Sequence, residues 1–318
     1  MFSLVVPVYK NEENIKPLVA ALQKISGEIE DEFEVVFVVD GSPDNSFQLL
    51  RDALPECGFS SQLVALSRNF GAFAAIRAGL EHARGDTMAV MAADLQEPPE
   101  LLVEMHKSLT AGECDVAYGE RARRQDGFVT TMLSKMFWSF YRRVVSSELP
   151  RGGVDIFGCT AQVRDQVLAL DERNSSLVGL LFWVGFKRKG IPYERAKREI
   201  GTSAWTFFKK WKYMQDSVFS FSDLPISLLL AIGFFGLIFS TTIGVVVFVA
   251  AFIGEIEVPG YAPTMLAIIF FGTLQILSIG VLGVYLWRVF ENTKGRPLHI
   301  VMSSEEFNQR QKERSEQV

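Results

Sequence analysis

The chain has 318 residues, of which 48% are hydrophobic and 22% charged, and its formal net charge is −5. This mixture is too apolar for an ordinary soluble protein and too charged for a protein that lies wholly within a membrane. The negative net charge argues against nucleic acid as a partner. We therefore expect two unlike parts, a globular domain at residues 1–223 and an apolar region after it.

The globular part alternates between strand and helix patterns, and residues 1–8 lead directly into the first of them without a cleavable leader. Short apolar runs typical of buried strands occupy residues 2–9, 33–40, 62–67, 87–93 and 114–120. Amphipathic stretches typical of helices occupy residues 11–25, 41–54, 72–83 and 99–109. This order predicts an α/β fold with a parallel sheet covered by helices on both faces.

Two of these strands end in an aspartate, Asp40 in VVDGSPDNS and Asp94 in AADLQEPPE. A single Asp after a strand is more often a turn or cap residue than a ligand. Right-handed crossovers, however, bring the carboxyl ends of parallel strands to one edge of the sheet, where α/β folds bind ligands. Neither a Gly-x-Gly-x-x-Gly motif nor a P-loop is present, so phosphate would have to be held through a cation. Asp94 and Gln96 are oxygen ligands suited to Mg²⁺ or Mn²⁺.

Two segments mix aromatic side chains with Lys and Arg at helical spacing, residues 128–145 and 205–221. A core helix with a basic solvated face has the same pattern. Helices that lie in the headgroup region of a membrane also have it, and we favour this second interpretation.

The apolar region contains two long uncharged runs, expected as transmembrane helices at residues 224–254 and 263–288. Each is long enough to cross about 30 Å of hydrocarbon. The connector 255–262 has two Glu and no Lys or Arg, whereas basic residues flank the outer ends of both runs. The positive-inside rule then predicts a hairpin in the cell membrane, with the domain and the tail 289–318 in the cytoplasm. The polar residues after Ser303 are expected to be partly disordered.

Five motifs, in order and spacing, resemble the polyisoprenyl-phosphate glycosyltransferases of glycosyltransferase family 2, the group similar to dolichol-phosphate-mannose synthases and bactoprenol glucosyltransferases. They are VPVYKNEENI, VVDGSPDNS, LSRNFGAFAAIRAGL, ARGDTMAVMAADLQEPPE and VGFKRKGIPYERAKREIGTSAWTF. The resemblance implies a GT-A (Rossmann-like) fold that moves a sugar, with inversion, from a nucleotide sugar to a polyprenyl phosphate for cell-envelope glycosylation. UDP is implied as the nucleotide by the resemblance alone. A catalytically silent nucleotide-sugar-binding or lipid-binding paralogue is the alternative.

The resemblance also implies roles for individual residues. Asp94 and Gln96 match metal ligands, and Asp155 matches the acidic position near the acceptor, so Asp94 and Asp155 are the expected catalytic residues. The positions expected to hold the nucleotide sugar are Pro7, Tyr9, Glu12, Asp40, Arg68 and Asp94. The candidates for holding the lipid phosphate are Arg121, Arg123, Arg124, Lys197, Arg198 and Ser203.

The chain departs from the family pattern at three positions that usually carry charge. Ala92 stands where relatives commonly have a second Asp, Val39 where they commonly have another, and Ala72 where they often have Lys. Losing a carboxylate weakens a divalent-metal site, but Asp40, Asp94 and Gln96 remain, and activity is expected. A transporter is the least favoured function, because the two apolar runs carry no charge along a pathway. The sequence leaves association between protomers open.

Overall fold

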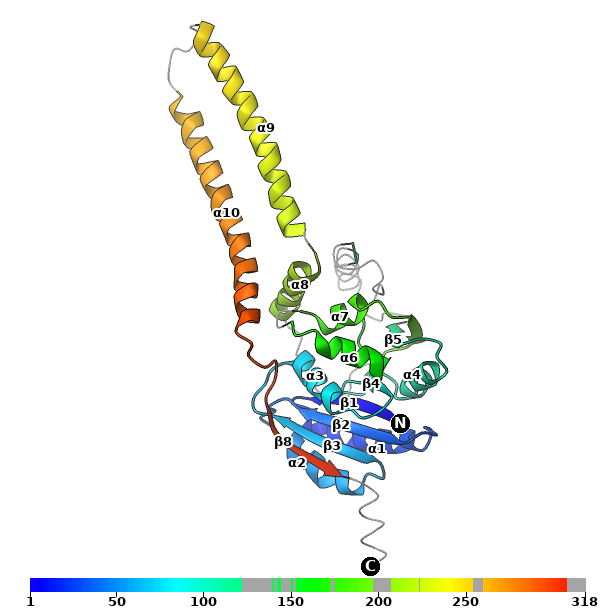
Figure 1. Ribbon diagram of the computed structural model, residues 1–318. Helices are drawn as coiled ribbons and strands as arrows, with labels where there is room; N and C mark the ends of the chain where they lie inside the picture. The colour runs from blue at the N-terminus through cyan, green and yellow to red at the C-terminus, as the bar shows by residue number, and fades with distance from the viewer. Residues whose placement is uncertain are drawn as a thin grey trace, which may run out of the picture.

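The computed structural model describes residues 1–121, 139, 142–143, 150, 153–172, 175–196, 207–222, 224–253 and 260–307. Its described part is one sheet of eight strands with helices on both faces, from which two long helices project as a hairpin (Figure 1). The strand order is β7-β5-β6-β4-β1-β2-β3-β8.

The centre of the sheet is parallel, as the sequence predicts. Strand β1 (Phe2–Val8) lies between β2 (Phe33–Val39) and β4 (Thr87–Val90), and β3 (Ser60–Leu66) pairs with the far side of β2. All three pairings are parallel. The near-continuous apolar runs in these strands follow from burial on both faces of the sheet.

The two flanks of the sheet correct the expectation of an all-parallel sheet. Strand β6 (Phe157–Thr160) pairs antiparallel with β4 and with β5 (Val116–Arg121), so it lies between these two strands. Strand β7 (Arg188–Tyr193) then pairs with β5 in parallel. The sheet is therefore mixed, because β6 and the last strand, which pairs with β3, run antiparallel to their neighbours.

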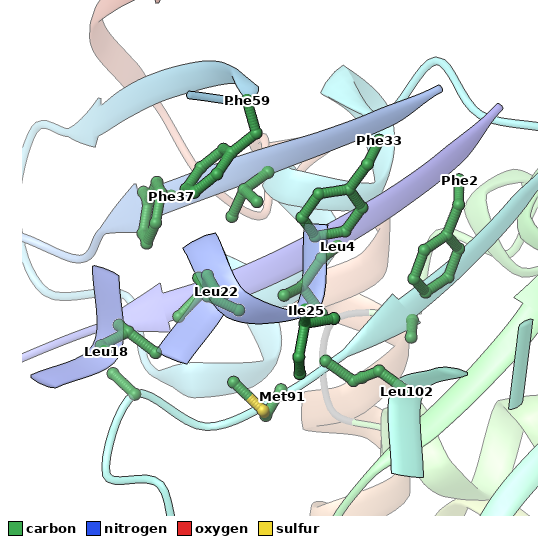
Figure 2. Close-up of a cluster of buried hydrophobic side chains, with 14 of the residues drawn as sticks. Phe2, Leu4, Leu18, Leu22, Ile25, Phe33, Phe37, Phe59, Met91 and Leu102 are labelled. Carbon is green, nitrogen blue, oxygen red and sulfur yellow. The ribbon is translucent and has the colours of Figure 1, made fainter. Parts of the chain in front are cut away.

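One face of the sheet packs against α1 (Ile15–Ser26), α2 (Ser46–Ala53) and α4 (Glu100–Thr110). Short 3₁₀ turns precede α1 at Glu12–Asn14 and follow α2 at Leu54–Glu56. Figure 2 shows Leu22 and Ile25 of α1 among the aromatic side chains of the sheet. The rings of Phe2 and Phe33 stack with centroids 5.8 Å apart.

The opposite face packs against α3 (Ala72–His82), α6 (Ala161–Ala169) and α7 (Leu177–Trp183). Alternate residues of one strand supply the two cores, since Leu4 belongs to the first and Val5 to the second. This two-sided burial fixes the strand register and with it the position of each strand end. Cys57, Cys114 and Cys159 are buried and free, as expected.

Helix α8 (Phe207–Phe221) leads into the hairpin of α9 (Leu224–Ile253) and α10 (Tyr261–Thr293). The stretches Leu224–Ile243 and Phe270–Thr293 are long and apolar enough to cross a membrane, and neither is buried against the rest of the protein. A core helix of a soluble protein would be mostly buried. Of the two segments expected at the membrane surface, 205–221 is helical from Phe207, and 128–145 lies almost entirely outside the described residues.

After the hairpin the chain returns to the sheet. Strand β8 (Val301–Phe307) pairs antiparallel with β3, and two ion pairs, Arg51 with Glu305 and Arg84 with Glu306, fasten it there. Partial disorder was expected after Ser303; the first four residues of this tail, as far as Phe307, are ordered because they cover the edge of β3. Residues 308–318 lie outside the described part of the chain.

Candidate active site

The carboxyl ends of the parallel strands form one edge of the sheet, and most predicted site residues follow these ends. Asp40 comes directly after β2, and Asp94 follows β4 by a short loop. Because β1 lies between β2 and β4, these two loops flank the end of one strand. The prediction that both aspartates lie at the same sheet edge is confirmed.

Pro7 lies in a central strand, where proline is normally excluded because it cannot donate to the ladder. Here the pairing of β1 with β4 ends at Val5 and Val90, so no residue of β4 lies opposite Pro7 to accept a backbone hydrogen bond. Its other neighbour, Val38 of β2, lies opposite it in register. Proline is therefore tolerated one residue before β1 ends at Val8, next to the loop that carries Tyr9 and Glu12.

Asp40 is 2% exposed and fastens the loop that follows β3. Its Oδ1 accepts a hydrogen bond from the backbone N–H of Phe70 at 2.7 Å, and its Oδ2 accepts one from Gly71 at 2.8 Å. Burial raises the pKa of Asp40, and these two backbone donors oppose the rise. Each carboxylate oxygen can accept more than one hydrogen bond, so Asp40 could accept a bond from a ligand in addition to those from Phe70 and Gly71.

The loops after β1 and β2 bond to each other rather than pointing freely into solvent. Glu12 accepts from the backbone N–H of Asn45 at 3.0 Å, and Asp44 accepts from that of Glu12 at 3.2 Å. Ser42 accepts from the backbone N–H of Lys10 at 2.8 Å. A cavity of about 290 Å³ lies between the two loops, lined by Lys10, Asn11, Glu12, Glu13, Asn14, Pro43 and Asp44.

Tyr9 and Arg68 border the same edge of the sheet. Tyr9 is 36% exposed, and the guanidinium of Arg68 lies 4.0 Å from the centroid of the Phe70 ring. Arg68 also donates to the backbone carbonyl of Asn69 at 3.1 Å. Arg68 is thus held against its own loop, beside the residues that bind Asp40.

The loop after β4 carries a local backbone strain next to the predicted metal ligands. Leu95, between Asp94 and Gln96, has a φ of +53°, which is uncommon for a branched residue. The backbone N–H of Gln96 donates to Asp94 Oδ1 at 3.3 Å. Strain of this kind persists where the surroundings enforce it, and it is often found at functional sites.

Asp155 lies before β6 and is held by side chains from the ends of two neighbouring strands. Arg121 at the end of β5 forms an ion pair with Asp155 Oδ2, and Tyr193 at the end of β7 donates to the same oxygen at 3.0 Å. The parallel register of β5 and β7 sets Arg121 opposite Tyr193, which explains their convergence. Burial lowers the pKa of Arg121, but the Asp155 carboxylate outweighs it and leaves that pKa raised.

Three residues of this cluster were not predicted: Glu97, Tyr193 and Arg195. Arg195 Nη2 donates to Gln96 Oε1 at 2.8 Å, and its guanidinium also approaches Asp155 and Glu97. No sequence spacing signals a contact between positions 99 residues apart. For Glu97 the sequence offered one signal, an acidic side chain directly after the predicted metal ligand Gln96.

Glu97 is fully buried, and its two carboxylate oxygens accept no hydrogen bond from the described residues. Burial raises its pKa to about 7, the nearby carboxylates of Asp155 and Asp94 add to the rise, and Arg195 opposes it. Arg195 Nε lies 3.4 Å from Glu97 Oε1.

This raised pKa predicts a stability change with pH in the metal-free protein. The folded form binds the Glu97 proton more tightly than the unfolded form, whose ordinary pKa is 4.5. The stabilisation is complete below pH 4.5 and is lost as the pH rises to about 7, a change on the order of 3 kcal/mol. Glu97→Gln should abolish this fall. Thermal unfolding in detergent with EDTA between pH 5 and 8 measures it, with Glu56→Gln as a surface control. A parallel pH profile in wild type and Glu97→Gln would contradict the expectation.

Five of the predicted lipid-phosphate residues cannot be placed, because Arg123, Arg124, Lys197, Arg198 and Ser203 lie outside the described residues. Arg121 is described and pairs with Asp155. The roles assigned to all the site residues stay predictions.

Comparison with known proteins gives a consistent result. The family described as "Glycosyl transferase family 2" matches residues 3–169. The chain is 36% identical to "Putative glycosyltransferase CsbB" of Bacillus subtilis (strain 168), over 95% of this chain and 91% of that protein. It is 30% identical to the "SfII prophage-derived bactoprenol glucosyl transferase" of Shigella flexneri, over 96% and 99%.

Among solved structures, a mannosyltransferase of Pyrobaculum calidifontis in complex with GDP-Man and Mn²⁺ is similar to this chain. The identity is 14% and the TM-score 0.48, with 90% of this chain and 87% of that one covered.

Proposed function

Because the chain belongs to glycosyltransferase family 2, we propose that it moves a sugar from a UDP-sugar to the phosphate of a polyprenyl lipid at the cytoplasmic face of the cell membrane. The chain is a glycosyltransferase with a GT-A fold. The observation that carries the lipid acceptor is the unburied helical hairpin of α9 and α10, which projects from the domain that contains the sheet (Figure 1). A relative named as a bactoprenol glucosyl transferase matches the chain along nearly its whole length, including this hairpin.

The loops after β1, β2 and β3 support the donor half of the proposal. They interlock through Glu12, Asp44 and Asp40, and the loops after β1 and β2 line a cavity at the carboxyl edge of the sheet. Open α/β sheets bind nucleotides at this edge. The nucleoside of the donor would lie here, with its diphosphate directed toward the neighbouring loop of Asp94.

The residues after β4 fit a divalent cation that is shared with the diphosphate. Asp94 offers a carboxylate, and the amide oxygen of Gln96 has a second lone pair beside the one that Arg195 occupies. In the described part of the chain no group of three His, Cys, Asp or Glu side chains could hold a metal ion alone. Mg²⁺ or Mn²⁺ binds readily through one or two carboxylates together with phosphate oxygens and water. When bound, the cation neutralises charge on the departing nucleoside diphosphate.

The acceptor half needs little activation by the protein. A phosphate monoester with a second pKa near 6 is mostly dianionic at pH 7 and is already a nucleophile. Asp155, paired with Arg121 and bonded to Tyr193, is better suited to hold these groups in place than to remove a proton. Arg121 would in turn meet the acceptor phosphate as it attacks the anomeric carbon with inversion.

The hairpin supports a membrane location for this chemistry. Both candidate spans are apolar and unburied, and Arg288 near the end of α10 bonds to Asp216 and Ser220 of α8. Basic residues at this end of the hairpin favour the cytoplasmic side. A polyprenyl phosphate in the same bilayer would present its head group at the level of the catalytic domain.

The test is a transfer assay with the purified full chain in detergent. Candidate nucleotide sugars, undecaprenyl phosphate and Mn²⁺ are incubated together, and lipid-linked sugar is detected by mass spectrometry. We expect one UDP-sugar to give product that depends on the lipid. Binding of UDP without transfer from any donor would instead favour the silent paralogue and overturn the proposal.

The missing carboxylate at position 92 gives a second prediction. Ala92→Asp restores a carboxylate two residues before Asp94, and more ligand charge strengthens a divalent site. We expect the variant to bind Mn²⁺ with UDP about 10-fold more tightly, seen as a larger rise of the melting temperature on adding both. Ala92→Asn is the matched control, since it has the same size without the charge. Equal shifts in the two variants would place position 92 outside the metal site.

A further inference from the structure

Arg195 contacts three functional groups from two separate parts of the chain. Its Nη2 donates to Gln96 Oε1 at 2.8 Å, its Nε lies 3.4 Å from Glu97 Oε1, and its Nη1 lies 3.8 Å from Asp155 Oδ2. Arg195 is 28% exposed by its side chain, so the guanidinium is largely enclosed by these acceptors. A planar guanidinium with fixed donors can set the relative positions of several oxygens, which a flexible ammonium does less well.

The backbone next to Arg195 is bonded to the same loop. Ala196 donates its N–H to the carbonyl of Gln96 at 2.9 Å, and the Gln96 amide reaches back to the carbonyl of Ala196 at 3.4 Å. Together with the Arg195 contact, both the main chain and the side chain of Gln96 are held by residues 195 and 196. The orientation of the Gln96 amide is therefore set by the segment after β7.

Glu97 explains why Arg195 stays in place. It is a fully buried carboxyl group, and the Arg195 guanidinium lies 3.4 Å from it. A buried charge is stable only when an opposite charge compensates it. Glu97 thus anchors the guanidinium, while the other two donors point to Gln96 and Asp155.

We infer that Arg195 is a positioning residue that joins the predicted metal ligand Gln96 to the acceptor-side carboxylate Asp155, with Glu97 as its buried counter-ion. The inference rests on the proposed function for the roles of Gln96 and Asp155. Arg195 is thus assigned a role that it exerts through Gln96 and Asp155. It acts by fixing the amide oxygen toward the cation and the carboxylate toward Arg121 and Tyr193.

Two variants of the full chain test this role: Arg195→Lys and the double variant Arg195→Gln with Glu97→Gln. Lysine keeps a charge for Glu97 but cannot donate to Gln96 and face both carboxyl groups in the same geometry. The double variant removes both charges and so avoids an unpaired buried carboxylate. Arg164→Gln is the control, because Arg164 is also largely enclosed, pairs with Asp165 and bonds to the backbone of Ala83.

The measurements are the Mn²⁺ affinity in the presence of UDP, by electron paramagnetic resonance, and kcat, KM and melting temperature. We expect Arg195→Lys and the double variant to fold with melting temperatures near wild type. Both should lose 10- to 100-fold in Mn²⁺ affinity and in kcat, the usual effect of removing a group that orients a metal ligand. The KM for the UDP-sugar should change less than kcat.

Wild-type Mn²⁺ affinity and kcat in both of these variants would overturn the inference and leave Arg195 a purely structural residue. The Mn²⁺ titration needs no turnover, so it also separates the two proposals. If the wild type transfers no sugar, the proposed function fails, and the Mn²⁺ affinities of the variants still decide whether Arg195 positions Gln96.

Discussion

Asp94→Asn is expected to lower kcat for sugar transfer about 10³-fold, which corresponds to a loss of about 4 kcal/mol of transition-state stabilisation. Of the two predicted metal ligands, Asp94 and Gln96, only Asp94 carries a charge, since Ala92 occupies the position where relatives commonly have a second Asp. Asparagine keeps the size and one oxygen but removes the charge. Without the Asp94 charge, the protein would offer the cation only neutral ligands. The charge that develops on the leaving diphosphate would then be poorly neutralised.

Asp86 provides the matched control, because it precedes the strand that Asp94 follows. Its side chain is 89% exposed and pairs with the amino terminus 3.1 Å away. Asp86→Asn should transfer sugar at the wild-type rate. Initial rates with saturating Mn²⁺ and donor measure both variants, and a kcat for Asp94→Asn within 10-fold of wild type would remove Asp94 from the reaction.

Gly41→Ala is expected to destabilise the catalytic domain by roughly 3–5 kcal/mol. Gly41 follows Asp40 with a φ of +55°, and an added Cβ would lie 2.3 Å from the carbonyl carbon of Arg68 and 2.4 Å from the nitrogen of Asn69. Both are backbone atoms, so the loop after β3 would have to move. Moving it would break the bonds from Phe70 and Gly71 to the buried Asp40 carboxylate.

Gly112→Ala separates this clash from simple backbone strain. Gly112 has a φ of +67°, yet an added Cβ meets no atom within 4 Å. It should cost only about 1 kcal/mol, the penalty for a side chain in the left-handed region. Urea unfolding of the domain and UDP binding measure both variants, and Gly41→Ala should also weaken UDP binding. Equal stability losses would mean that the loops at positions 41 and 68 adjust without cost.

The local parts of the fold could be predicted from the sequence because they depend on short patterns. The apolar runs around Val35 and Val64 and the amphipathic spacing of α1 and α4 each identify an element from its own residues. The positions of Asp40 and Asp94 followed once the central strands were assumed to be parallel.

The rest depended on contacts that no local pattern encodes. Strand β6 enters the sheet against the direction of its neighbours, and β8 joins it from beyond the hairpin. In the site, Arg195 reaches Gln96 across 99 positions, and Tyr193 meets Arg121 only through the register of β5 and β7. Glu97 and Arg195 stand in no recognisable motif in the sequence. Only its burial in the structure distinguishes Glu97 from a surface acid.

The place of β8 has a consequence for how the protein is made. This strand covers the edge of β3, whose Leu63 and Val64 are fully buried, and it is synthesised only after both hairpin helices. Until β8 has been synthesised, the nascent chain has an uncovered edge at β3. Such an edge can pair with other chains and cause aggregation. A fragment that stops before the hairpin would keep that edge permanently. The catalytic sheet is therefore completed only after both hairpin helices have been synthesised.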